Sequence, residues 1–192
     1  MFKGTSASAG IGIGKAVIVE EAELVITRNE VADAEAEIQR FKGALEKTIA
    51  ATQKMADDLA SRVGEKEAEI MQGHMMLLSD PMLTGEIENS VKNDKVNCEF
   101  AIENVCNMYA DMFASMGDEL MQQRATDMRD IKVRMQRTLM GLESVDVSLL
   151  PKGSILVAKD LTPSMTAGIN PANVTGIVTE LGGKTSHSAI LA

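Results

Sequence analysis

Apolar and polar positions follow different patterns along the chain, and the pattern changes twice. Near the N-terminus, residues 15–20 read Lys-Ala-Val-Ile-Val-Glu, a β-branched apolar run that is typical of a strand. Between residues 31 and 142, apolar residues recur mostly four positions apart, which is the period of an amphipathic helix. Short β-branched runs return at 153–158 and 174–179. The pattern predicts a strand, a long helical stretch, and then strands again.

Glycine and proline divide the helical stretch into separate segments. Gly64 and Gly117 interrupt the apolar period, and Pro81 ends one segment and allows another to begin. The predicted helices cover residues 31–63, 65–78, 82–93, 98–116 and 118–142.

The isolated N-terminal strand predicts how the domains are organised. A strand without neighbours leaves its backbone N–H and C=O groups unpaired, and the other predicted strands all follow residue 145. We therefore expect residues 1–22 and 144–192 to form a small α/β domain, with a helical domain of residues 30–142 inserted between them. The expected fold class is α+β, a helical bundle inserted into an α/β domain.

Composition narrows the range of partners and locations. The formal net charge of −9 disfavours nucleic acid and favours a basic protein surface as a partner. Cys98 and Cys106 lie about 12 Å apart along one predicted helix, beyond the ~7 Å that a disulfide spans. Reduced thiols fit a cytoplasmic location. No apolar run is long enough for a signal peptide or a membrane span.

The strongest chemical signal is a histidine at the end of a glycine turn. His187 follows Gly182 and Gly183, between a predicted strand and a predicted helix start. The glycines let the backbone pass close to a bulky group, and a helix start offers free N–H groups to an anion. A neutral imidazole is a nucleophile near neutral pH. The segment therefore favours a phosphoryl-accepting histidine, although a histidine at a helix start can also simply cap or pack.

Neighbouring side chains suit this chemistry. Thr185 and Ser186 offer hydroxyl groups, and Lys184 can offset phosphate charge or remain solvated.

Five stretches together carry a resemblance to a known family. Residues 182–191 resemble the phosphohistidine signature of enzymes that use phosphoenolpyruvate. Residues 4–16, 73–81, 124–131 and 160–164 are similar, in the same order, to segments of Enzyme I of the bacterial sugar phosphotransferase system. The chain is thus identified as resembling the N-terminal phosphotransfer part of that family.

The resemblance implies a reaction in two halves. Nε2 of His187 accepts a phosphoryl group from phosphoenolpyruvate and passes it to a histidine of the carrier protein HPr. The first half needs Mg²⁺ and a C-terminal barrel domain, through which the family also forms homodimers. This chain contains no such barrel, and we expect no metal site in it. Thr166 matches a family threonine that contacts the active histidine, although a capping hydroxyl is an equal reading.

The resemblance also implies that the helical insert docks HPr, whose docking face is apolar with basic edges. The matching residues are Glu65, Glu67, Ile70, His74, Leu77, Asp80 and Arg124. An apolar stripe of this kind can equally be bundle core. Lys66, Pro81 and Met82 stand where the family pattern has acidic residues. The charges at 124–130 are expected to form a solvated, ion-paired surface, from which Arg124 reaches the partner.

Two other classes of function stay open. One is the phosphohistidine domain of a pyruvate phosphate dikinase or phosphoenolpyruvate synthase, which would not bind HPr. The other is a catalytically inactive helical adaptor, in which replacing His187 would change only stability. Because the family has further α/β structure after this point, we also expect His187 to be poorly positioned here, or the chain to self-associate through an open sheet.

Overall fold

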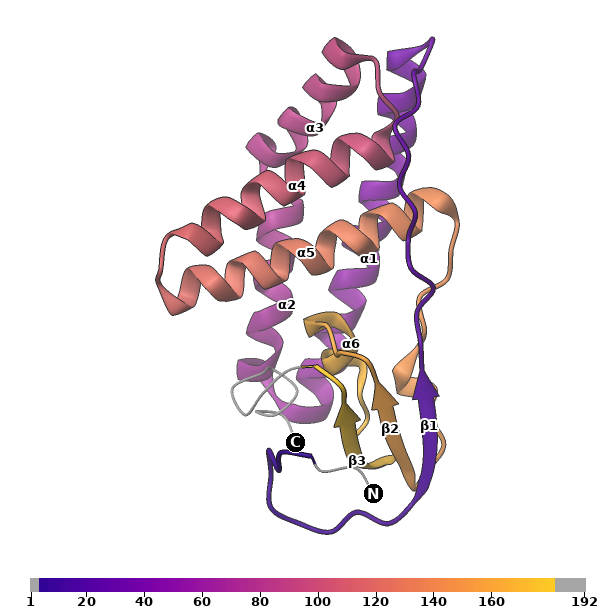
Figure 1. Ribbon diagram of the computed structural model, residues 1–192, viewed down its shortest axis with the longest axis vertical. Coiled ribbons are helices and arrows are strands. Elements are labelled where there is room, and N and C mark those ends of the chain that lie inside the picture. Colours follow the sequence, from indigo (N-terminus) through magenta and orange to yellow (C-terminus); the bar gives the residue numbers. More distant parts are fainter. Residues whose placement is uncertain (1–3, 182–192) are drawn as a thin grey trace. The chain divides into compact units, whose positions relative to one another are not determined.

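Two units share the chain, and each is built from different secondary structure. The computed structural model describes residues 4–181, except for the side chains of Val63, Lys66 and Glu67. One unit comprises residues 1–22 and 145–192, and the other comprises residues 23–144 (Figure 1).

The first unit is a small parallel sheet. Strands β1 (Lys15–Val19), β2 (Ser154–Ala158) and β3 (Val174–Thr179) pair in that order. The N-terminal strand thus pairs with a strand far along the chain, as its unpaired edge requires. In the described part of this unit, helix α6 (Pro163–Gly168) and a 3-10 turn, η1 (Val147–Leu149), accompany the sheet. The apolar core gathers Val19, Val147, Leu150, Leu156, Ala158 and Leu161. The α+β fold class predicted from the pattern is confirmed.

The sheet buries only one of its faces well. Leu156 is fully buried, whereas Ile18 is 68% exposed and Val178 is 54% exposed. These two exposed residues flank Val157 in one cross-strand row. Parallel sheets usually have both faces covered. Self-association through such a face stays a prediction.

A close backbone approach explains the glycines before β1. The amide of Lys15 donates to the carbonyl oxygen of Gly153 at 3.0 Å. A Cβ on Gly14 would overlap that same oxygen, and Gly153 itself has φ +79°. Only glycine lets the chain enter the sheet along this path.

The second unit is a bundle of five helices. They are α1 (Ala34–Val63), α2 (Glu65–Leu78), α3 (Pro81–Asp94), α4 (Cys98–Ser115) and α5 (Glu119–Met140). These bounds lie within about three residues of the predicted ones. The largest difference is at the start of α1, where Asp33 caps the helix by accepting from the amides of Glu35 and Ala36. Val31 lies outside the helix because its amide donates to the Lys95 carbonyl.

Helices α4 and α5 run side by side (Figure 1). Helix α5 packs against α1 and α2, and α4 packs against α3. Their shared core is apolar and fully buried. Its largest side chains include Phe41, Leu78, Ile87, Ile102, Ile131 and Met135. Both cysteines are free and buried, and burial raises the pKa of the Cys106 thiol to about 12. The apolar stripes read from the sequence are therefore the faces that meet in this core.

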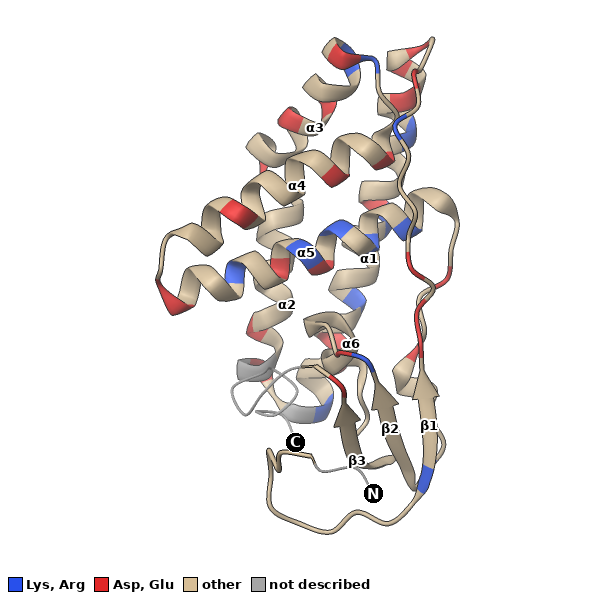
Figure 2. Cartoon of the chain, viewed as in Figure 1, with Lys and Arg blue, Asp and Glu red and all other residues tan. Residues whose placement is uncertain are grey.

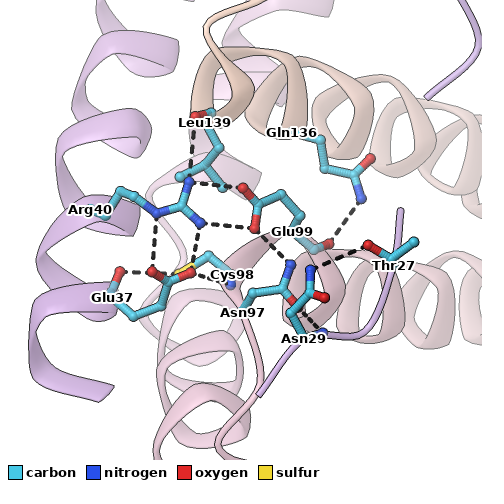
Figure 3. A network of polar contacts seen from close by, with 9 residues as sticks. All are labelled: Thr27, Asn29, Glu37, Arg40, Asn97, Cys98, Glu99, Gln136 and Leu139. Atoms are coloured by element: carbon cyan, nitrogen blue, oxygen red, sulfur yellow. Dashed lines mark hydrogen bonds and ion pairs between the residues drawn. The ribbon is translucent and has the colours of Figure 1, made fainter. Parts of the chain in front are cut away.

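A polar clamp fastens the N-terminal ends of α1 and α4 (Figure 3). The Arg40 guanidinium donates to Glu37 at 2.6 Å and to both carboxylate oxygens of Glu99 at 2.8 Å. Glu99 also accepts from the Asn97 amide, and Asn97 accepts from the backbone amide of Asn29. Burial opposes ionisation of Glu99, but hydrogen bonds from Arg40 and Asn97 outweigh it and hold its pKa below the ordinary value.

Because of the clamp, the free energy of unfolding should depend on pH in the acidic range. A depressed folded pKa means that Glu99 stabilises the fold above its ordinary value of 4.5. That contribution is lost as pH falls through the lower folded pKa. Glu99→Gln should reduce the free energy of unfolding by about 1–2 kcal/mol at pH 7, and the difference from wild type should shrink below pH 4.5. Urea unfolding from pH 7 to pH 3 measures this.

Glu88→Gln is the matched control. Its ion pair with Lys42 is exposed, with side-chain exposures of 32% and 45%. We expect Glu88→Gln to change the free energy of unfolding by less than about 0.5 kcal/mol at pH 7. Equal losses in the two variants would contradict the role assigned to the clamp.

The close approach at Gly14 predicts opposite effects for one substitution at two glycines. Gly14→Ala should destabilise the sheet by about 1–3 kcal/mol, because the obstructing atom belongs to the backbone. Gly43→Ala, in α1 with open space around it, should stabilise that helix by about 0.5–1 kcal/mol. Amide hydrogen exchange should be faster in β2 for the first variant and slower in α1 for the second. An unchanged exchange rate in β2 would show that the approach is not tight.

Candidate functional site

The expected phosphoryl-accepting segment lies outside the described residues. This holds for His187 and for its expected supporting residues Gly182, Gly183, Lys184, Thr185 and Ser186. Their roles therefore stay predictions.

Thr166 is the expected active-site residue that the structure describes. It is buried in α6, and its hydroxyl donates to the carbonyl of Thr162 at 2.9 Å. Thr162 in turn caps the helix by accepting from the amide of Met165. Because the Thr166 hydroxyl donates its proton to the backbone, its oxygen can act toward another group only as an acceptor. It can accept from an N–H group such as that of an imidazole.

The expected docking residues fall into three environments. Glu65 is exposed at the start of α2, while Ile70 and Leu77 are half-buried along the same helix. Asp80 caps α3 by accepting from the amide of Met82 at 2.8 Å. Arg124 keeps 31% of its side chain exposed. The side chain of Glu67 lies outside the description.

His74 corrects the expectation of a continuous surface stripe on α2. The residue is 0% exposed, so it cannot touch a partner in this conformation. Met71 and Leu78, one turn away on either side, are equally buried. The stripe through His74 therefore faces the bundle interior, which is the alternative that helical spacing alone could not exclude.

The carboxylates of α5 also lie where the sequence did not place them. Asp127 and Asp130 are 6% and 4% exposed, so the expected solvated surface is wrong at these positions. His74 lies between them, with Nε2 3.3 Å from Asp127 Oδ1 and Nδ1 3.7 Å from Asp130 Oδ2. Arg129 does remain on the surface, with 52% of its side chain exposed. A charge pattern read along the chain does not reveal which helix face is buried.

Exposed methionines are the feature that sequence reasoning missed. Met76 is 70% exposed and Met82 is 67% exposed, on either side of the junction between α2 and α3. Further exposed methionines follow at helical spacing in the second half of α4. We call the whole set the methionine face: Met76, Met82, Met108, Met112 and Met116. The four-residue spacing of 108, 112 and 116 indicates that these methionines share one face of the helix, but such a face can equally be buried in a core.

Tyr109 belongs to the same half of α4 as Met108 and Met112. Desolvation, with the nearby carboxylates of Glu86 and Asp80, raises the pKa of the Tyr109 hydroxyl. Asp80 caps α3 and Glu86 lies within it, and α3 packs against α4.

Charge is divided unevenly between neighbouring helices (Figure 2). The sequence of α4 contains Glu99, Glu103 and Asp111 but neither Lys nor Arg. The sequence of α5 contains Arg124, Arg129, Lys132, Arg134 and Arg137. Acidic residues near the methionine face suit a partner with basic edges.

Two further findings concern the described residues alone. None of their helices combines the length and apolar character needed to cross a membrane. No group of three or more His, Cys, Asp or Glu among residues 4–181 is arranged to hold a metal ion.

Family models match both units of the chain. The model described as PEP-utilising enzyme, N-terminal, matches residues 3–124, and the one described as PEP-utilising enzyme, mobile domain, matches residues 150–192. The phosphoenolpyruvate-protein phosphotransferases of Listeria monocytogenes and Bacillus subtilis are 42% and 40% identical over 100% of this chain. The match covers 33% and 34% of those proteins, so the chain spans about a third of their length.

Solved structures agree with this assignment. The solution structure of Enzyme I (nEIt) matches with a TM-score of 0.89 and 38% identity, over 100% of this chain and 78% of that one. The N-terminal domain of Enzyme 1 - Nitrogen matches with a TM-score of 0.68 and 25% identity, over 96% and 76%. The chain therefore belongs to the PEP-utilising enzymes, and within them to the Enzyme I proteins, whose N-terminal fold it shares.

Proposed function

We propose that this chain is a phosphoryl carrier that exchanges a phosphoryl group between His187 and a histidine of HPr. The observation that supports this most directly is that both units match Enzyme I while the helical unit exposes an apolar face with acidic neighbours. Homologues named phosphoenolpyruvate-protein phosphotransferase support the class of reaction. The chain thus acts as the phosphotransfer part of a protein phosphotransferase.

In this proposal Thr166 orients the active imidazole. An imidazole that attacks phosphorus through Nε2 must carry its proton on Nδ1 and hold it in a hydrogen bond. The Thr166 hydroxyl already donates to the Thr162 carbonyl, so it is available to accept that bond. The glycine turn and the side chains of residues 184–186 then stabilise charge on the phosphoryl oxygens.

The proposed docking surface is the methionine face together with the half-buried residues of α2. Methionine side chains are flexible and polarisable, and they adapt to a partner at little strain. Glu65, Asp80 and Arg124 supply polar edges around Ile70 and Leu77. Contact through Glu67 stays a prediction. His74 is left out of the contact set because it is buried.

We place the handling of phosphoenolpyruvate and Mg²⁺ in the two thirds of the relatives that this chain does not span. Homodimerisation is proposed for that same part, and the reaction is proposed to take place in the cytoplasm, in the service of sugar uptake. On these terms the chain exchanges phosphoryl groups with phospho-HPr and needs no metal of its own.

Transfer of label from ³²P-phospho-HPr tests the proposal. Wild type should acquire an acid-labile, base-stable label, and His187→Ala should acquire none. Thr166→Val should slow transfer by at least about tenfold, while Thr166→Ser keeps the hydroxyl and should stay close to wild type. Label on His187→Ala would refute the assignment. Wild type that neither binds HPr nor takes label would favour a dikinase-type domain or an adaptor.

The docking surface predicts a difference between two exposed methionines. Met76→Lys should weaken HPr binding by about tenfold or more. The substitution removes apolar area that docking would bury, and it adds a positive charge opposite a basic partner. Met140, the last residue of α5, is 42% exposed and lies outside the proposed surface, so Met140→Lys should leave HPr affinity unchanged. Isothermal titration with unphosphorylated HPr measures both. Equal affinities for the two variants would remove Met76 from the docking surface.

A further inference from the structure

A buried histidine without good hydrogen bonds joins α2 to α5. His74 is fully buried, and each of its ring nitrogens lies near a carboxylate, at 3.3 Å from Asp127 and 3.7 Å from Asp130. Neither ring nitrogen has a hydrogen bond of good geometry, and neither does Asp127 Oδ1. Buried polar atoms cost free energy unless they are paired. An apolar side chain would fill this space at lower cost, so the imidazole calls for a further explanation.

The Asp127 carboxylate lies between the histidine and a partly exposed arginine. Oδ2 of Asp127 lies 3.7 Å from Nη1 of Arg124, whose side chain is 31% exposed. The same Nη1 lies over Gly73, where a Cβ would stand only 2.6 Å away. The guanidinium is thus held between Gly73, the residue before His74, and Asp127, the carboxylate next to the His74 ring.

The Asp130 carboxylate has a different neighbour. Burial lowers the pKa of Arg134, and the nearby charge of Asp130 partly opposes this effect. Arg134 in turn donates to Thr52 of α1 at 2.6 Å. The two ring nitrogens of His74 therefore face two separate sets of groups. Nε2 faces Asp127 and the exposed Arg124, whereas Nδ1 faces Asp130 and the interior.

We propose that His74 is a positioning residue for docking. The Nε2 side of its ring lies 3.3 Å from Asp127 Oδ1 and holds that carboxylate beside the Arg124 guanidinium. The guanidinium is thereby kept against Gly73, where it donates to an acceptor on the docked carrier. This inference rests on the proposed function only in its last step. The positioning of Arg124 is a property of the free chain.

Two amide substitutions distinguish the roles of the two ring nitrogens of His74. The side-chain amide of Gln reaches the place of Nε2, and that of Asn reaches the place of Nδ1. His74→Gln should keep the contact to Asp127, and His74→Asn should lose it. Asn is one methylene shorter than Gln and leaves the larger cavity at this buried site. Asp127→Asn, which keeps the ring, is therefore the control for lost packing.

The first measurement uses the free chain. The side-chain Nε–Hε resonance of Arg124, assigned with Arg124→Lys, reports rotation of the guanidinium by NMR. Rotation should be slow in wild type and His74→Gln and faster in His74→Asn. Asp127→Asn leaves the imidazole in place and should also release Arg124, which keeps the test valid if a His74 variant unfolds. Equal rotation in all forms, or equal release in both His74 variants, would overturn the positioning role.

The second measurement is HPr affinity by isothermal titration. His74→Asn should bind about tenfold more weakly, the scale of one charge-assisted contact, while His74→Gln should bind nearly as wild type does. If Arg124 responds as expected but the affinities of the two variants are equal, Arg124 is positioned for something other than docking. If wild type does not bind HPr at all, the proposed function fails although the positioning stands.

Discussion

The pairing of β1 with β2 is the constraint on which the rest of the architecture depends. It aligns Lys15 with Ser154 and Val19 with Ala158. The whole helical unit is therefore an insertion in the chain between two strands that pair with each other. Closing a loop of this length costs little more entropy than closing a shorter one. The glycines at 14 and 153 let the backbone make the approach that starts the pairing. A folded insert with its own core can therefore be carried by a small sheet.

Within the helical unit, α5 is the helix that other parts depend on most. It is the most polar of the five long helices, yet it buries Asp127, Asp130, Arg134, Gln136 and Arg137. Each of these groups needs a partner from elsewhere because unpaired burial is costly. Hydrogen-bond partners come from α1 and α4, for example Thr52 and Glu103, and from the segment after α5, where the Glu143 carbonyl accepts from Arg137. Polar contacts thus fix how α5 lies on its neighbours, where an apolar interface would leave it freer to slide.

The sequence foretold the elements and the fold class better than it foretold the site. Helix bounds followed from breakers such as Gly64, Pro81 and Gly117, whose effects are local, whereas the cap at Asp33 was missed. Which face of α2 is buried depends on packing against α5, so periodicity placed His74 on a stripe without showing that the stripe faces inward. Exposure of Met76 and Met82 is likewise a tertiary outcome, because methionine serves both as core filler and as contact surface.

The most direct test of the docking account maps the contact on the chain itself. Unlabelled HPr is titrated into the ¹⁵N-labelled chain, and the backbone amide shifts are followed. The account predicts that shifts concentrate at the end of α2, the start of α3 and the second half of α4, around the methionine face. Residues of the Arg40 clamp should not respond. Shifts centred on the clamp, or none at saturating HPr, would contradict the account.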